Sequence, residues 1–171
     1  VYYYKTSGTG GTGWRSTSDL FTDQSKTILR VTDGVIVRRK LSAAVILSLP
    51  GTVKLGQTQR LALPGLNFFS DIYPSGTTLS NSGLYDAAHP ANSLQGGGAS
   101  TADQVLLYDG SRYLVYYYKI GGTGGDGWRS TDSPFTDQGS APLPAGQSII
   151  VRRFLNQSFV WIAPQPFVVA P

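Results

Sequence analysis

The chain has 171 residues and a formal net charge of +4, and 40% of its residues are apolar. It contains no Cys and a single His, and every acidic residue is Asp. The absence of Cys excludes disulfides, thiolate nucleophiles and thiolate-bound metals, and we expect no cofactor. Abundant Gly, Thr, Tyr and Val beside a shortage of strong helix formers exclude a mostly helical fold.

The predicted elements are short strands separated by turns rich in Gly and Pro. In the first part of the chain we predict strands at Val1–Lys5, Trp14–Thr17, Val35–Arg39 and Val45–Leu49, with a glycine-rich turn between the first two. The middle predicts a strand at Arg60–Pro64, a single helical turn between Ser75 and Tyr85, and a loop or linker at Asp86–Ala102. The last part predicts strands at Asp103–Gly110, Arg112–Ile120, Trp128–Thr131, Ser148–Phe154 and Ser158–Ala163, and an apolar segment at Phe167–Ala170. We therefore predict an all-β fold with at most one short helix.

An internal repeat relates the two ends of the chain. The segment Val1–Lys5 recurs as Val115–Lys119, an offset of 114 residues. The same offset, without a gap, aligns Gly13–Thr17 with Gly127–Thr131, Phe21–Gln24 with Phe135–Gln138, and Ile36–Arg39 with Ile150–Arg153. A period of 114 residues fits the 171-residue chain one and a half times. We predict two related antiparallel β-sandwich or barrel-like lobes, with an incomplete repeat at 1–57, a connecting segment at 58–102 and a second repeat at 103–171.

Several motifs that can carry chemistry have structural interpretations here. The run Gly8–Gly13 fits a phosphate-binding pattern, but a strand rather than a helix is predicted after it, which favours a hairpin tip. His89 lies in a predicted loop without a nucleophile motif. Calcium binding by Asp126, Asp132 and Asp137 stays an alternative for the second repeat. We predict no enzymatic activity.

Charged residues that recur in both copies are expected to be structural. Asp23 and Asp137 are typical turn formers. Each pair, Arg38-Arg39 and Arg152-Arg153, places one guanidinium on either side of a strand, where one is expected to lie over an aromatic ring or meet an Asp. The remaining basic residues are scattered, so nucleic acid is not an expected partner. The longest apolar run is shorter than the roughly 20 residues of a membrane span.

The repeat leads us to expect that the first tyrosine strand lacks a neighbouring strand. The first copy has no segment equivalent to Asp103–Gly110 before Val1. If that segment pairs with the tyrosine strand in the second copy, the first copy has an open edge, and open edges recruit other strands. We therefore expect a structural subunit of an extracellular filament or surface assembly, which polymerises with copies of itself by head-to-tail β-strand donation. The candidate polymer interface comprises Val1, Tyr2, Tyr3, Tyr4, Phe159, Trp161, Phe167, Val168 and Val169.

An alternative is a carbohydrate-binding or adhesive module, because flat aromatic rings stack well on glycans. Its candidate platform is Tyr117, Trp14 and Trp128, although tryptophans in such strands more often anchor a core. A component of a virion tail or fibre is a third alternative.

One family resemblance rests on the second copy. Asp103–Tyr108, the run Tyr116–Tyr118, Gly127-Trp128-Arg129 and the stretch from Gly146 to Arg153 carry it. Together they resemble an uncharacterised family of secreted, repeat-containing, β-rich bacterial proteins. The similarity spans Leu61–Pro164 and, as a half copy, Val1–Pro50. The resemblance implies export and an extracellular or cell-surface location, and it implies no particular activity.

Overall fold

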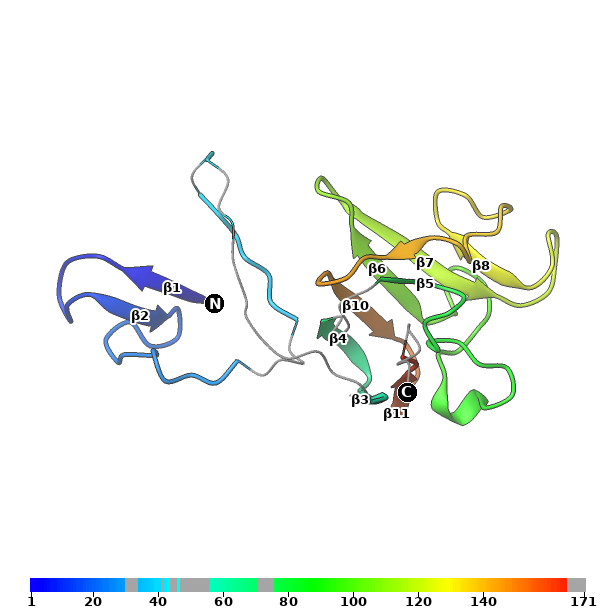
Figure 1. Cartoon of the computed structure of the whole chain (residues 1–171), viewed down its shortest axis with the longest axis horizontal. Helices are drawn as coiled ribbons and strands as arrows, with labels where there is room; N and C mark the ends of the chain where they lie inside the picture. Colours follow the sequence, from blue (N-terminus) through cyan, green and yellow to red (C-terminus); the bar gives the residue numbers. More distant parts are fainter. Residues whose placement is uncertain (30–33, 41, 44–45, 47–55, 71–75, 166–171) are drawn as a thin grey trace, which may run out of the picture. The chain divides into compact units, whose positions relative to one another are not determined.

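The computed structural model describes residues 1–29, 34–40, 42–43, 46, 56–70 and 76–165 of the chain (Figure 1). Within these ranges the strands pair antiparallel, and the helical content is a single short 3-10 turn, which confirms the all-β prediction. The sheets formed by the described residues do not close into a barrel. The chain divides into an N-terminal unit, Val1–Arg30, and a C-terminal unit, Val31–Pro171, and each is described by itself.

The N-terminal unit is built on one hairpin. Strand β1 (Tyr2–Lys5) pairs antiparallel with β2 (Gly13–Ser16), which places Tyr4 opposite Trp14. The loop after β2 returns along the outer edge of that strand, where the Gln24 N–H donates to the Trp14 carbonyl at 2.9 Å. The predicted hairpin is therefore present, and its second strand is already lined by its own chain.

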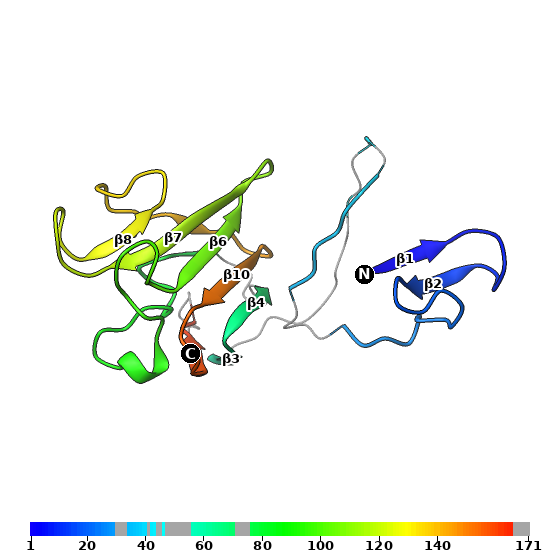
Figure 2. The same cartoon turned by 180° about the vertical axis from the view of Figure 1, so that it is seen from behind.

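A five-stranded antiparallel sheet forms the centre of the C-terminal unit, with strand order β4-β10-β6-β7-β8 (Figures 1 and 2). Its strands are β4 (Gly65–Ser70), β6 (Gln104–Tyr108), β7 (Tyr113–Lys119), β8 (Gly127–Ser130) and β10 (Ser148–Arg153). The pairing on which the missing-strand hypothesis depends is present, because β6 pairs with β7 and Val105 lies opposite Tyr116. Val105 of β6 and Val151 of β10 are fully buried, as expected for the central strands of a covered sheet.

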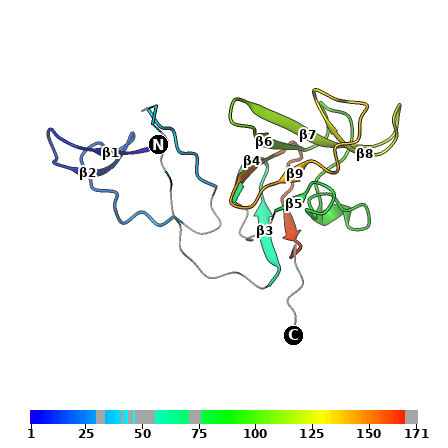
Figure 3. The same ribbon diagram turned by 45° about the horizontal axis from the view of Figure 1, so that its top comes forward.

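Two shorter strand pairs pack with this sheet (Figure 3). They join β3 (Thr58–Ala62) to β11 (Phe159–Ala163) and β5 (Thr77–Thr78) to β9 (Pro142–Leu143). Trp161 of β11 packs against Phe69 of β4 with 5.5 Å between ring centroids, and its Nε1 donates to the Ser82 carbonyl at 2.8 Å. Strand β11 is therefore part of the core of the C-terminal unit.

The prediction for the second arginine pair is confirmed. Arg153 Nη1 donates to Asp103 Oδ2 at 2.8 Å, both side chains are buried, and the guanidinium lies 4.7 Å from the centroid of the Phe159 ring. Asp103 also accepts the backbone N–H groups of Phe154 at 2.8 Å and Gln95 at 2.9 Å. One buried carboxylate thus ties the end of β10 to the loop that precedes β6.

Predictions for the middle of the chain are partly wrong. Thr77–Thr78 forms β5 instead of opening a helical turn, because pairing with β9 outweighs the local capping signal of the threonines. The 3-10 turn lies at Pro90–Asn92 instead, within the segment expected to be a loop or linker. The strand β4 is absent from the prediction, although Asn67 and Phe69 are buried and alternate with exposed residues.

The strand predicted at Val35–Arg39 is not formed, and the residues 35–37 are exposed. The equivalent residues of the second copy lie in β10, between β4 and β6, and those two strands supply the backbone partners that a strand requires. An apolar run alone therefore does not specify this strand. The strand predicted at Val45–Leu49 falls outside the described residues apart from Ile46.

Candidate functional site: an uncovered tyrosine hairpin

The glycines between β1 and β2 make the hairpin possible. Gly8, Gly10 and Gly11 have φ angles of +92°, +88° and +73°, in the region that other residues rarely adopt. The turn closes with a hydrogen bond from the Gly11 N–H to the Gly8 carbonyl at 3.0 Å. A strand follows the turn, so the glycine pattern builds a hairpin tip and not a phosphate-binding loop.

A buried arginine fastens this tip to the strands. Arg15 Nη1 donates to its neighbour's carbonyl, that of Trp14, at 2.8 Å, and to Asp23 Oδ1 at 3.3 Å. Arg15 Nη2 donates to the Gly10 carbonyl at 2.5 Å. Hydrogen bonding from the Ser25 hydroxyl is the main cause that lowers the pKa of Asp23, and the nearby Arg15 charge lowers it further. We call this set of contacts the arginine clamp.

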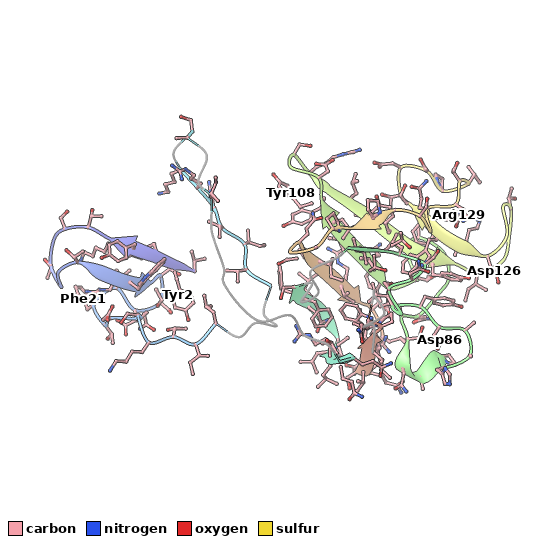
Figure 4. All side chains as sticks on the ribbon, in the orientation of Figure 1. Tyr2, Phe21, Asp86, Tyr108, Asp126 and Arg129 are labelled. Atoms are coloured by element: carbon pink, nitrogen blue, oxygen red, sulfur yellow. The ribbon has the colours of Figure 1, made fainter. Side chains whose placement is uncertain are left out.

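The C-terminal unit contains the same hairpin in the same register. Tyr116 lies opposite Ser130 in β7 and β8, as Tyr2 lies opposite Ser16 in β1 and β2. Arg129, which is labelled in Figure 4, repeats the clamp. Its Nη1 donates to the Trp128 carbonyl at 2.8 Å and to Asp137 at 3.1 Å, and its Nη2 donates to the Gly124 carbonyl at 2.6 Å. The described hairpins are therefore matched both in backbone pairing and in the contacts that hold their tips.

The clamp arginines did not emerge from the sequence as functional candidates. Asp23 and Asp137 were expected to form turns, which they do through hydrogen bonds from the N–H groups of Ser25 and Gly139. The sequence does contain the signal, because an Arg precedes each of these Asp residues by eight positions in both copies. That spacing could have predicted the ion pair.

The two hairpins differ in how far their aromatic side chains are covered. Tyr2 is 52% exposed, whereas its counterpart Tyr116 is 7% exposed. Trp14 is 45% exposed, whereas Trp128 is 3% exposed. The edge-to-face contact between Tyr4 and Trp14, at 5.6 Å and 80°, is the same as that between the equivalent rings of the second hairpin, at 5.8 Å and 86°. Similar local structures thus have different surroundings.

Three features of the C-terminal unit cover the second hairpin. Strand β6 pairs along the outer edge of β7. The ring of Tyr85 stacks on that of Tyr118 with 3.4 Å between centroids and 12° between planes, and burial is the main cause that raises the pKa of Tyr85. The Gly97 N–H donates to the Tyr118 carbonyl at 2.9 Å. In the N-terminal unit, the described residues pair β1 with β2 alone.

The backbone groups at this uncovered edge follow from strand geometry. The Val1 carbonyl accepts the Thr17 N–H at 2.9 Å, so Val1 directs its backbone toward the β2 side. Residues of an antiparallel strand alternate in the side to which their N–H and C=O groups point. Tyr2 and Tyr4 therefore direct both backbone groups away from β2, and Tyr3 directs its groups toward β2. We call this edge, with the side chains of Tyr2, Tyr3, Tyr4 and Trp14, the tyrosine edge.

The other members of the candidate interface lie elsewhere. Phe159 and Trp161 are buried in β11, paired with β3, so they are not available to another molecule while that sheet is intact. Phe167, Val168 and Val169 fall outside the described residues. Of the expected interface, the structure therefore places Val1 and the three tyrosines of β1 on one accessible element.

The candidate glycan platform is divided in the same way. Tyr117 and Trp128 are each only 3% exposed, so neither ring can stack on a sugar. Trp14 is accessible, and the ring beside it is Tyr4. The expectation that the tryptophans anchor a core holds for Trp128 and not for Trp14.

The candidate calcium ligands do not gather. Asp126 accepts the N–H of Gly121 at 2.6 Å, Asp132 pairs with Arg112 at 2.7 Å, and Asp137 belongs to the second clamp. In the part of the chain that the structure describes, no three His, Cys, Asp or Glu side chains gather in a group that could hold a metal ion.

His89 belongs to a surface pair. Its Nδ1 lies 2.7 Å from Asp86 Oδ2, and both side chains are substantially exposed. The hydrogen bond with His89 is the main cause that lowers the pKa of Asp86. The pair closes the short loop before the 3-10 turn.

Comparisons of the chain with protein-family models, curated proteins and solved structures found no match. Among the described ranges, no helix combines the length and apolar character needed to cross a bilayer. A function is therefore inferred from the tyrosine edge itself.

Proposed function

We propose that the chain is a structural subunit of an extracellular filament or surface assembly, in which another molecule adds a strand at the tyrosine edge. The observation that supports this most directly is the contrast between two matched hairpins, one covered by β6 and one uncovered. The proposed role is non-enzymatic, and the extracellular location follows the resemblance to secreted repeat proteins.

The energetics of a two-stranded hairpin favour such an addition. An isolated hairpin is at best marginally stable in water, and it gains from a third strand with an apolar face. The tyrosine edge offers four aromatic side chains that are 36% to 54% exposed. Completing the burial of each would contribute roughly 1 kcal/mol, since a fully buried apolar side chain contributes about 1.5–3 kcal/mol. N–H and C=O groups at the same edge, which have no backbone partner among the described residues, make this attraction directional.

The donor and the acceptor in this proposal are different surfaces. Phe159 and Trp161 stay in the core of their own molecule, so the donated strand comes from another part of the partner. When one surface binds a different surface of the next copy, the contact repeats without closing unless the rotation closes a ring. Assembly through the tyrosine edge would therefore produce filaments.

A proline substitution separates strand addition from hairpin folding. Tyr2→Pro removes an N–H that points away from β2, and proline is tolerated at such edge positions. Tyr2→Ala removes the same side chain but keeps the N–H, and it serves as the matched control. We expect concentration-dependent assembly of the unaltered chain in sedimentation and electron microscopy, loss of assembly in Tyr2→Pro, and partial retention in Tyr2→Ala.

The outcomes of this test are distinct. A chain that remains monomeric at all accessible concentrations contradicts the proposal. Equal assembly of the unaltered chain and Tyr2→Pro contradicts the role of the tyrosine edge. Circular dichroism of both variants shows whether the sheet content is preserved.

One observation favours a second function, glycan binding. The rings of Tyr4 and Trp14 are both exposed and meet edge to face, which leaves aromatic surface open to a sugar. Binding to a glycan array should then be lost in Trp14→Ala, while Trp128→Phe, altered in a buried position, should bind normally. Absence of binding by the unaltered chain would exclude this function for the sugars tested.

A further inference from the structure

We infer that the tyrosine edge takes a strand of the type Gln104–Tyr108, in the register that β6 adopts on β7. This inference rests on the proposed function in using the same edge, and it adds the chemistry and register of the partner. The hairpin β7–β8 matches β1–β2 in register, and β6 is the strand that pairs along its edge.

The register follows from the 114-residue offset. Val105 lies opposite Tyr116, so the equivalent residue of the added strand lies opposite Tyr2. Gln104 lies opposite Tyr117, so its equivalent lies opposite Tyr3. The Tyr118 carbonyl points toward the β6 side, as its bond to Gly97 shows. By alternation Val105 and Tyr116 form a hydrogen-bonded pair, and the added strand would exchange both backbone bonds with Tyr2.

The side chains of β6 define the chemistry of the partner. Val105 and Leu107 are buried against the core that contains Tyr116 and Trp128. The partner strand therefore needs an apolar residue opposite Tyr2, at the position that Val105 has in β6. Gln104 is also buried and donates from Nε2 to the Ala99 carbonyl at 3.0 Å, so the partner accommodates a polar residue opposite Tyr3.

Two further contacts come from residues that precede β6 in the sequence, so the partner extends beyond the strand itself. The Tyr85 ring covers Tyr118, and the Gly97 N–H reaches the Tyr118 carbonyl. Their counterparts in the N-terminal unit would act on Tyr4, whose ring is 54% exposed. The segment 84–110 thus contains three features that cover one hairpin, and a partner of this type would satisfy the backbone and the aromatic face together.

The test uses the full chain and a synthetic peptide with the sequence of residues 84–110. Hydrogen exchange measured by mass spectrometry should show slower exchange in fragments that contain Tyr2–Lys5 when the peptide is present. Reading these fragments separates binding at the tyrosine edge from displacement of β6 in the C-terminal unit.

Two proline variants of the peptide supply the matched control. Val105→Pro removes the N–H that would bond to Tyr2, whereas Gln104→Pro removes an N–H on the opposite side of the strand. We expect Val105→Pro to bind about three- to tenfold more weakly than Gln104→Pro, the scale of one hydrogen bond. Equal affinities of the two variants, or no protection by the unaltered peptide, would overturn the inference.

Failure here is distinguishable from failure of the proposed function. Protection that grows with the concentration of the chain, but not with the peptide, would identify another copy's β1 or a different segment as the occupant; the inference would fail and assembly would stand. Peptide binding in the predicted register by a chain that never assembles would leave the inference standing and contradict the proposed function.

Discussion

The strongest internal test replaces the same residue in the two hairpins. Trp128→Ala removes an indole that is 3% exposed and packs against Tyr118 with 5.8 Å between ring centroids. Trp14→Ala removes the equivalent indole, which is 45% exposed and packs against Tyr4. If burial, and not the local hairpin, sets the energetic role of this residue, the two substitutions should differ greatly in their effects.

The expected magnitudes follow from the degree of burial. Truncation of a buried Trp to Ala removes transfer free energy and leaves a cavity, which costs about 3–5 kcal/mol. We expect this loss for Trp128→Ala in the free energy of unfolding of the C-terminal unit. Trp14→Ala should change that free energy by less than about 0.5 kcal/mol, because Trp14 is half exposed and belongs to the N-terminal unit.

Urea denaturation followed by tryptophan fluorescence can measure both changes. Trp161 is 8% exposed, lies in the core of the C-terminal unit, and is retained in both variants as the reporter. Trp128→Phe, which keeps an aromatic ring, should give an intermediate loss. Similar midpoints for Trp14→Ala and Trp128→Ala would refute the reasoning, because only the indole buried in the C-terminal unit should support the stability of that unit.

Three further predictions concern charged residues of the C-terminal unit. Arg129→Met should destabilise the unit by about 3 kcal/mol, since it removes the hydrogen bonds from a buried guanidinium to the Trp128 and Gly124 carbonyls. Asp137→Asn should cost about 1 kcal/mol or less, because that carboxylate is 65% exposed. Equal losses of urea midpoint in the two variants would contradict this. Asp103→Asn should cost about 3–5 kcal/mol in the same assay, because its arginine partner stays buried, and a neutral result would show that the pair is dispensable. Hydrogen bonds from the backbone N–H groups of Arg112 and Ser111 lower the pKa of Asp109 to about 2. The ionised carboxylate therefore stabilises the folded turn fully above pH 3.8, its ordinary pKa, and this contribution is lost as the pH falls toward 2. An NMR titration of Asp109 with a midpoint near 3.8 would contradict this prediction.

Much of the second repeat could be predicted from the sequence because its signals are local. The alternation in Arg112–Ile120, the glycines of 121–127 and the returning Trp128 together specify a hairpin, and the structure contains it. The pairing of Gln104–Tyr108 with this hairpin was also accessible, since neighbouring strands joined by a short turn usually pair.

The remaining errors concern partners that are distant along the chain. Thr77–Thr78 forms a strand through pairing with residues 142–143, which no local pattern indicates. Strand β4 pairs with β10, more than seventy positions further along the chain. The run at 35–39 is as apolar as its copy in β10 but lies outside any strand. Local propensity therefore described turns and hairpins well, and it could not say which strands find long-range partners.

The difference between local contacts and long-range pairing also explains why the tyrosine edge can accept a strand. The clamp of Arg15 and the positive-φ glycines hold the N-terminal hairpin through contacts within residues 1–25, and these contacts do not require a covering strand. A hairpin fixed in this way has already lost much of the conformational entropy that strand addition would otherwise remove. Binding to such a preorganised edge retains more of the gross interaction free energy. Loosening the clamp, for example by Arg15→Lys, should therefore weaken strand addition even though Arg15 itself lies away from the open edge.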